Sequence, residues 1–99
     1  MIQIQETKNF SDWLYKLNKK EQLQIAARLE RIKTQAYFGD VKNLGKGLCE
    51  LRWKNGWRLY FIASKSSIIL IIGGHKNEQE KNIKKARIFV KQYTSPSNK

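Results

Sequence analysis

The sequence predicts an α+β domain in the order β-α-α-β-β-β-α, with a helical hairpin packed on a mostly antiparallel, twisted sheet. Two observations carry this prediction. Apolar residues recur at helical spacing in three segments, and a β-hairpin signal lies at the centre of the chain. The length of 99 residues favours a single domain, which we place at residues 1–93, followed by a flexible tail at residues 94–99.

The N-terminal part predicts a short strand and two helices. Ile2 and Ile4 alternate with glutamines, which is the period of a strand. The first helix is marked by apolar residues at i, i+3, i+4 and i+7, namely Phe10, Trp13, Leu14 and Leu17. After a break at residues 18–20, helical spacing continues to about residue 36. Residues 37–48 contain three glycines and predict a loop.

Residues 50–61 predict a β-hairpin around Asn55-Gly56, for which two registers compete. A two-residue turn would mix polar and apolar side chains on both faces. A three-residue loop, with Gly56 at a left-handed position, pairs Arg52 with Arg58 and separates the faces, so we expect this register. The apolar face would hold Cys49, which we interpret as a packing residue rather than a nucleophile. The polar face would be formed by Glu50, Arg52, Arg58 and Tyr60.

The C-terminal part predicts one more strand and a helix. Residues 65–67 form a turn, and residues 68–72 are apolar on both faces, which is typical of a central strand. Gly73-Gly74 is expected to be a bend after this strand. Asn77 with Glu80 resembles a capping box at the start of the last helix. The inner face of that helix is formed by Ile83, Ala86, Phe89 and Val90.

The charge of the chain is high and uneven. The formal net charge is +12; residues 1–40 carry seven bases and five acids, whereas residues 41–99 carry thirteen bases and three acids. Such a balance favours a polyanionic partner, although charge that serves only solubility is the alternative. The longest apolar run, residues 68–72, is too short for a membrane helix, and the first residues do not resemble a signal peptide. We therefore expect a cytoplasmic protein without a membrane partner.

Metal and cofactor chemistry are not expected from this sequence. The chain has one histidine, one cysteine and no cluster of carboxylates, which does not suffice for an ordinary zinc or calcium site. It also lacks the glycine motifs that bind nucleotides.

The polar face of the hairpin is the place where chemistry is expected. Guanidinium groups on rigid strands match a phosphate group, and metal-free RNA cleavage needs cations around the phosphate with a base and an acid beside it. Glu50, a lysine or His75 would serve as the base. The alternative is a solvated face with weak ion pairs. The candidate catalytic residues are Glu50, Arg52, Arg58, His75 and Lys76. The candidate RNA contacts are Lys46, Lys54, Tyr60 and Lys84.

Several of these segments resemble the addiction-module killer proteins (the HigB-like group) of the RelE/ParE toxin superfamily. The resemblance is carried by residues 39–52 with Glu50-Leu-Arg52, by residues 56–61 with Trp57-Arg58, and by Gly73-Gly74-His75-Lys76. It runs from about residue 4 to residue 90. It implies a RelE-like fold and a toxin of a type II system that is neutralised by a cognate antitoxin of the helix-turn-helix type.

The resemblance also implies activities and roles. RelE-like members cut mRNA on the ribosome without a metal, and ParE-like members inhibit DNA gyrase. We expect the first activity; gyrase inhibition without catalysis, or antitoxin binding alone, are the alternatives. Arg58 matches the arginine linked to the scissile phosphate, Arg52 a basic position on the preceding strand, and Lys76 the lysine of Gly-Gly-x-Lys. His75 replaces an aspartate of many relatives, and Ile83 stands nearest to a tyrosine of RelE-like members.

Overall fold

A computed structural model describes residues 1–93 of the chain, and the expected tail at residues 94–99 lies outside the described residues. The strands form one sheet in the order β1-β5-β4-β3-β2, in which only the β1–β5 pair is parallel. The elements are β1 (Gln3–Glu6), α1 (Lys8–Tyr15), α2 (Lys19–Gln35), β2 (Val41–Gly45), β3 (Leu48–Arg52), β4 (Trp57–Ser64), β5 (Ser67–His75), a 3₁₀ turn η1 (Lys76–Glu78) and α3 (Gln79–Tyr93).

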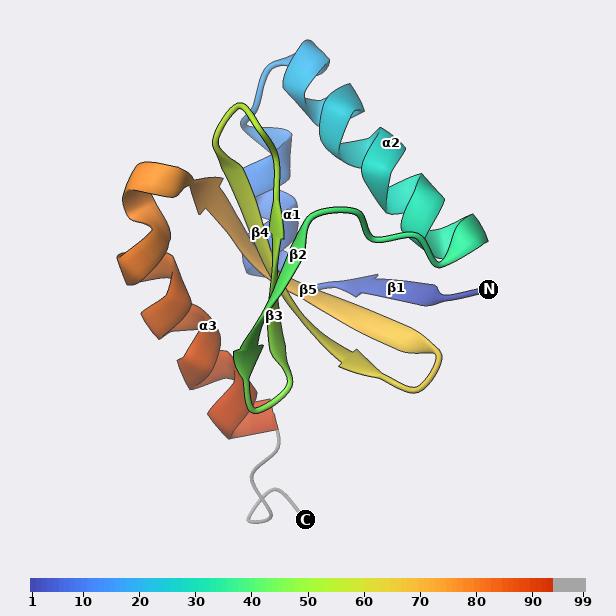
Figure 1. The fold of residues 1–99 in the computed structure, drawn as a ribbon. Coiled ribbons are helices and arrows are strands. Elements are labelled where there is room, and N and C mark those ends of the chain that lie inside the picture. Colours follow the sequence, from blue (N-terminus) through green and yellow to red (C-terminus); the bar gives the residue numbers. More distant parts are fainter. Residues whose placement is uncertain (94–99) are drawn as a thin grey trace.

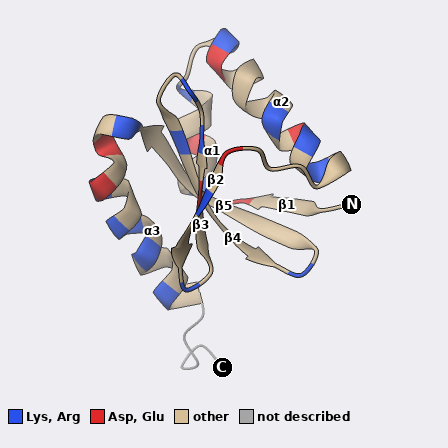
Figure 2. Cartoon of the chain, in the orientation of Figure 1, with Lys and Arg blue, Asp and Glu red and all other residues tan. Residues whose placement is uncertain are grey.

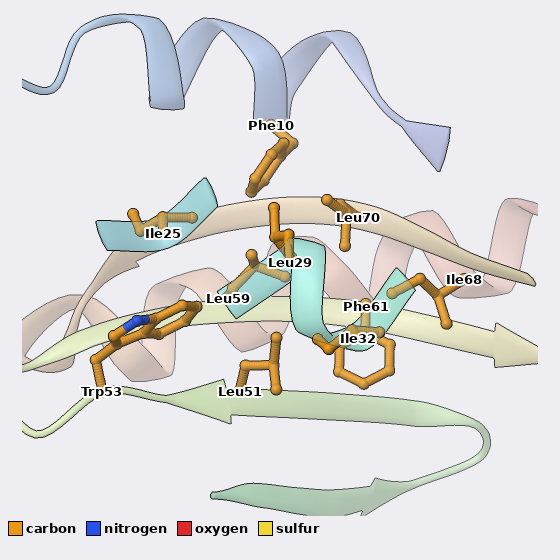
Figure 3. Packing of buried hydrophobic residues seen from close by; sticks show 10 residues of the cluster. All are labelled: Phe10, Ile25, Leu29, Ile32, Leu51, Trp53, Leu59, Phe61, Ile68 and Leu70. Carbon is orange, nitrogen blue, oxygen red and sulfur yellow. The ribbon is translucent and has the colours of Figure 1, made fainter. Parts of the chain in front are cut away.

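The sheet is covered on both faces (Figure 1). Helices α1 and α2 cover one face, and Figure 3 shows their side chains above those of β3, β4 and β5. This first core contains Phe10, Ile25, Leu29, Ile32, Leu51, Trp53, Leu59, Phe61, Ile68 and Leu70. Helix α3 covers the other face, where a smaller core contains Leu48, Tyr60, Ile62, Ile71 and Ala86. The predicted α+β fold, with two helices packed on a mostly antiparallel sheet, is confirmed.

The N-terminal helices begin where polar side chains cap them. Thr7 precedes α1: its hydroxyl accepts a hydrogen bond from the Phe10 backbone N–H (3.1 Å) and donates one to the Ile71 carbonyl (2.7 Å). Asn18 precedes α2 and forms a capping box with Glu21. The break predicted at residues 18–20 therefore reflects a helix start, because such a cap satisfies free N–H groups of the first turn.

The segment at residues 37–48 differs from the predicted loop. Residues Val41–Gly45 form the edge strand β2, which pairs antiparallel with β3 and returns through a tight turn at Lys46 and Gly47. Both turn residues have positive φ (56° and 85°), a conformation that glycine adopts without strain. The glycines therefore lie at the turn of a hairpin. The segment forms a strand because it pairs with β3, although its apolar residues show little alternation. The order becomes β-α-α-β-β-β-β-α.

The central hairpin has the predicted register. Leu51 faces Leu59 and Arg52 faces Arg58 across β3 and β4. The loop closes with a hydrogen bond from the Gly56 N–H to the Trp53 carbonyl (3.0 Å), and Gly56 has a φ of 106°. The apolar side chains of this hairpin, Cys49 included, pack in the first core.

Two predictions about the C-terminal part are wrong. Gly73 and Gly74 do not form a bend, because β5 continues through them to His75. A Cβ atom at Gly73 would collide with the Trp13 ring, and one at Gly74 with the Asn82 amide, so glycine lets both helices approach this strand. Asn77 is not the helix cap either. Glu78 instead accepts a hydrogen bond from the His75 N–H (3.0 Å), and η1 leads into α3.

Strand β5 lies between β1 and β4, as expected of a central strand. Among residues 1–93, no helix combines the length and the apolar character needed to cross a membrane.

Candidate functional site

Glu50 lies at the centre of a buried polar cluster between the sheet and the start of α3. Its side chain is fully buried. Its Oε2 atom accepts hydrogen bonds from the Tyr60 hydroxyl (2.9 Å) and the Gln79 side-chain amide (2.7 Å), and lies 3.9 Å from Nε of Arg58. Oε1 has no hydrogen-bond partner. A buried carboxylate needs such donors, so this cluster ties β3 and β4 to α3.

Arg58 extends from Glu50 toward the end of the sheet where the β3–β4 loop lies. Its side chain is only 13% exposed. Nη1 donates hydrogen bonds to the carbonyl oxygens of Trp57 (3.0 Å) and Trp53 (3.2 Å), whereas Nε has no acceptor within hydrogen-bond range. Arg52 lies opposite on β3, is half-buried, and its Nε also lacks a partner. The two arginines are therefore cross-strand neighbours, and the Nε donor of each has no hydrogen-bond partner.

Two further predicted residues lie at the same end of the sheet. Lys54 is exposed in the β3–β4 loop, and Lys76 is exposed directly after β5. The Lys76 backbone N–H donates to the Gly56 carbonyl (2.7 Å), which fastens the end of β5 to the hairpin loop. We call Arg52, Lys54, Arg58 and Lys76 the loop-end cations.

His75 reaches this end from the other face of the sheet. It pairs with Trp57 across β4 and β5, and the two rings meet edge to face at 5.4 Å. Trp57 in turn packs against Trp13 of α1, so this histidine is on the α1 side, whereas Arg58 and Glu50 are on the α3 side. The sheet therefore separates the candidate catalytic residue His75 from Arg58 and Glu50.

Helix α3 covers part of the polar face of the hairpin. Tyr60, expected to contact RNA, is fully buried in the second core, and Glu50 is shielded by Gln79. The sequence pattern missed Gln79 as a partner of Glu50. The only indication of Gln79 in the sequence is its position at the start of a helix, and the predicted packing face of that helix contains apolar residues alone.

Lys46 and Lys84 do not join the loop-end cations. Lys46 lies in the β2–β3 turn, at the opposite end of β3 from Lys54. It lines a cleft of about 710 Å³ with Arg87, Val90 and Lys91 from α3. Lys84 is exposed on α3, where Figure 2 shows lysine and arginine positions spread along the helix.

Arg28 of α2 holds the backbone next to the loop-end cations. Its guanidinium donates to the carbonyl oxygens of Phe38, Asp40 and Arg52, and lies 4.5 Å from the Trp53 ring centroid. Burial lowers the pKa of this arginine from its ordinary value. Because it holds the last residues of β3, it fixes the backbone from which the Arg52 side chain extends.

We expect Tyr60→Phe to destabilise the fold by about 1–3 kcal/mol at pH 8, because it removes a donor to a buried carboxylate. Burial, then the hydrogen bond to Glu50, raise the pKa of Tyr60 above its ordinary value of 10.0. A raised pKa means that the native state keeps this proton above pH 10 while the unfolded chain loses it, so this stabilisation falls as pH rises. Urea unfolding at pH 8 to 11 should show the difference between wild type and variant shrinking above pH 10. A constant difference would contradict the assignment.

Comparison with known proteins adds one sequence relative and several structures. No family profile matches the chain. An uncharacterized protein of Haemophilus influenzae is 37% identical over 95 residues, covering 92% of this chain and 95% of the relative.

The solved structures with this fold include toxins. The isolated RelE toxin of Escherichia coli has a TM-score of 0.65 at 16% identity, covering 84% of this chain and 99% of RelE. The intact RelBE toxin–antitoxin complex of E. coli has a TM-score of 0.65 at 15% identity, covering 76% of this chain and 96% of the matched chain. The YoeB–YefM complex of Staphylococcus aureus has a TM-score of 0.58 at 19% identity, covering 76% and 97%.

Proposed function

We propose that this chain, which belongs to one family with the Haemophilus influenzae protein and has the fold of the RelE toxin superfamily, is the toxin of a type II toxin–antitoxin pair. Toxins and toxin–antitoxin complexes recur among the structures that share its fold. Since a fold does not fix a reaction, the activity is proposed from the residues of this chain.

The proposed activity is metal-independent cleavage of mRNA on the ribosome. The observation that carries it is the set of loop-end cations: Arg52 faces Arg58 across two strands, with Lys54 and Lys76 at the same end of the sheet. Four cations gathered at one rigid end of the sheet suit a phosphodiester, because guanidinium groups bind phosphate oxygens in pairs.

The cleavage step needs charge stabilisation and two proton transfers. The 2′-oxygen of the RNA attacks the neighbouring phosphorus, the bond to the 5′-oxygen breaks, and one proton leaves the first oxygen while another reaches the second. Arg58 and Arg52 would stabilise the extra charge on the phosphate oxygens. Glu50, enclosed by Tyr60 and Gln79, holds Arg58 in place rather than accepting the proton.

The proposed partners are a cognate antitoxin and ribosome-bound mRNA. The basic half of the chain favours an antitoxin with an acidic segment that covers the loop-end cations, because opposite charge steers association and screens the site. A disordered segment that folds on binding suits this role.

Induced expression tests the proposal. We expect growth arrest, new mRNA 5′ ends that depend on translation, and relief of both by the gene encoded beside this one. Growth without arrest would contradict the toxin assignment. Arrest with intact mRNA and halted DNA replication would favour gyrase as the target.

A further inference from the structure

A cleft of about 360 Å³ lies between α1 and α3, and none of the loop-end cations lines it. It exists because β1 ends at Glu6, opposite Leu70, while β5 continues to His75. The last residues of β5 therefore have no strand on this side. The two helices flank the opening, and Ile72 and Gly73 lie between them.

The cleft has a small excess of positive charge, with three lysines against two acids in its lining. Lys16 of α1 and Lys81 and Lys85 of α3 line it, and within residues 1–93 none of the three forms an ion pair. The two acidic residues in the lining already have partners. Asp12 accepts a hydrogen bond from Lys8 at 2.8 Å, and Glu78 accepts one from the His75 N–H. The three ammonium groups are thus available to an anion.

Asn82 lines the same cleft and is only 4% exposed. No hydrogen bond joins its side-chain amide to another residue in the described part of the chain. Its place is fixed by packing against Gly74, where a Cβ atom would collide with it. Because this residue is held in place by packing and lines the cleft, its amide offers a fixed polar group to a ligand bound there.

We propose that this cleft binds a phosphate group of single-stranded RNA, as an additional contact beyond the loop-end cations. This inference rests on the proposed function for the identity of the polyanion. Lysine ammonium groups bind phosphate as point charges, and the Asn82 amide supplies a fixed N–H donor. Lys76 is the first residue of η1, which leads directly into α3 at Gln79, so a strand bound at Lys76 reaches Lys81 and Lys85 by passing this turn.

The test measures direct binding of a short fluorescent single-stranded RNA to the purified full chain at several salt concentrations. We expect the double variant Lys81→Gln/Lys85→Gln to bind roughly tenfold more weakly, with the slope of log affinity against log salt reduced by about 0.7. The matched control is Lys20→Gln/Lys33→Gln, which removes the same charge from exposed positions of α2. Equal loss in both double variants would overturn the proposal, because it would reflect net charge alone.

A second measurement locates the ligand. In the ¹⁵N-labelled chain, the side-chain amide signals of Asn82 should shift on addition of the RNA and less so in Lys81→Gln/Lys85→Gln. Shifts with inorganic phosphate but not RNA, or with an acidic peptide but not RNA, would overturn the assignment to RNA. RNA binding without any shift at Asn82 would overturn the cleft while leaving the proposed function intact; absence of growth arrest by wild type would instead overturn the proposed function.

Discussion

Replacing Arg58 by glutamine is expected to slow mRNA cleavage by about 10²–10³-fold, because one preorganised charge donor is lost from the phosphate site. Nη1 of Arg58 donates to the Trp53 and Trp57 carbonyl oxygens, which fixes the position of this guanidinium group at the loop end of the sheet. The measurement is cleavage of ribosome-bound mRNA by purified protein, together with growth arrest after induction.

Two comparison variants separate this effect from loss of fold. Arg31→Gln removes a guanidinium group from the exposed side of α2 and should cleave like wild type. Arg58→Lys keeps the charge beside Glu50 but loses the paired N–H geometry, so it should fold normally and still lose most of the activity. Full activity in a folded Arg58→Gln protein would show that the loop-end cations are not the cleavage site.

Replacing Glu50 by alanine is expected to lower the free energy of unfolding by about 3–5 kcal/mol, the largest stability effect anticipated here. The substitution leaves Tyr60 and Gln79 without their shared acceptor and removes the carboxylate that faces the mostly buried Arg58. Urea unfolding followed by tryptophan fluorescence measures the change. Glu80→Ala, at an exposed acidic position of α3, is the control and should change stability by no more than about 0.5 kcal/mol.

Glu50→Gln then distinguishes a positioning role from a proton-transfer role. The amide keeps an acceptor for Tyr60, so the variant should fold, but it loses the charge that faces Arg58. If Glu50 positions Arg58, cleavage slows while its pH profile keeps its shape. Loss of one limb of the pH profile would instead identify Glu50 as the base.

The N-terminal helices and the central hairpin were accessible from the sequence because their signals are local. Asn18 with Glu21 closes a capping box within one turn, and the period of apolar residues identified α1 and α2. In the hairpin, a one-residue slip would have exchanged the faces of β3 and β4, so the alternation around Gly56 sufficed to fix the pairing of Arg52 with Arg58. The resemblance to RelE-like toxins was likewise borne out at the level of the fold.

Strand β2 was harder to predict from the sequence. Its stabilisation comes from hydrogen bonds to β3 rather than from its own apolar pattern, and the glycines around it have the composition of a loop. Gly73 and Gly74 illustrate the same limit, since only the approach of Trp13 and Asn82 explains why a strand contains two glycines.

The sequence by itself determined which residues share a strand, a helix face or a turn, because these relations depend on neighbours within a few positions. Tertiary structure alone decided which faces are covered. Helix α3 docks over the polar side chains of β3 and β4, so Gln79 encloses Glu50, Tyr60 leaves the surface, and His75 stands apart on the α1 side. The physical reason is that burial depends on contacts between segments distant in the chain, here Glu50 and Gln79, whose separation of 29 positions leaves no periodic signal.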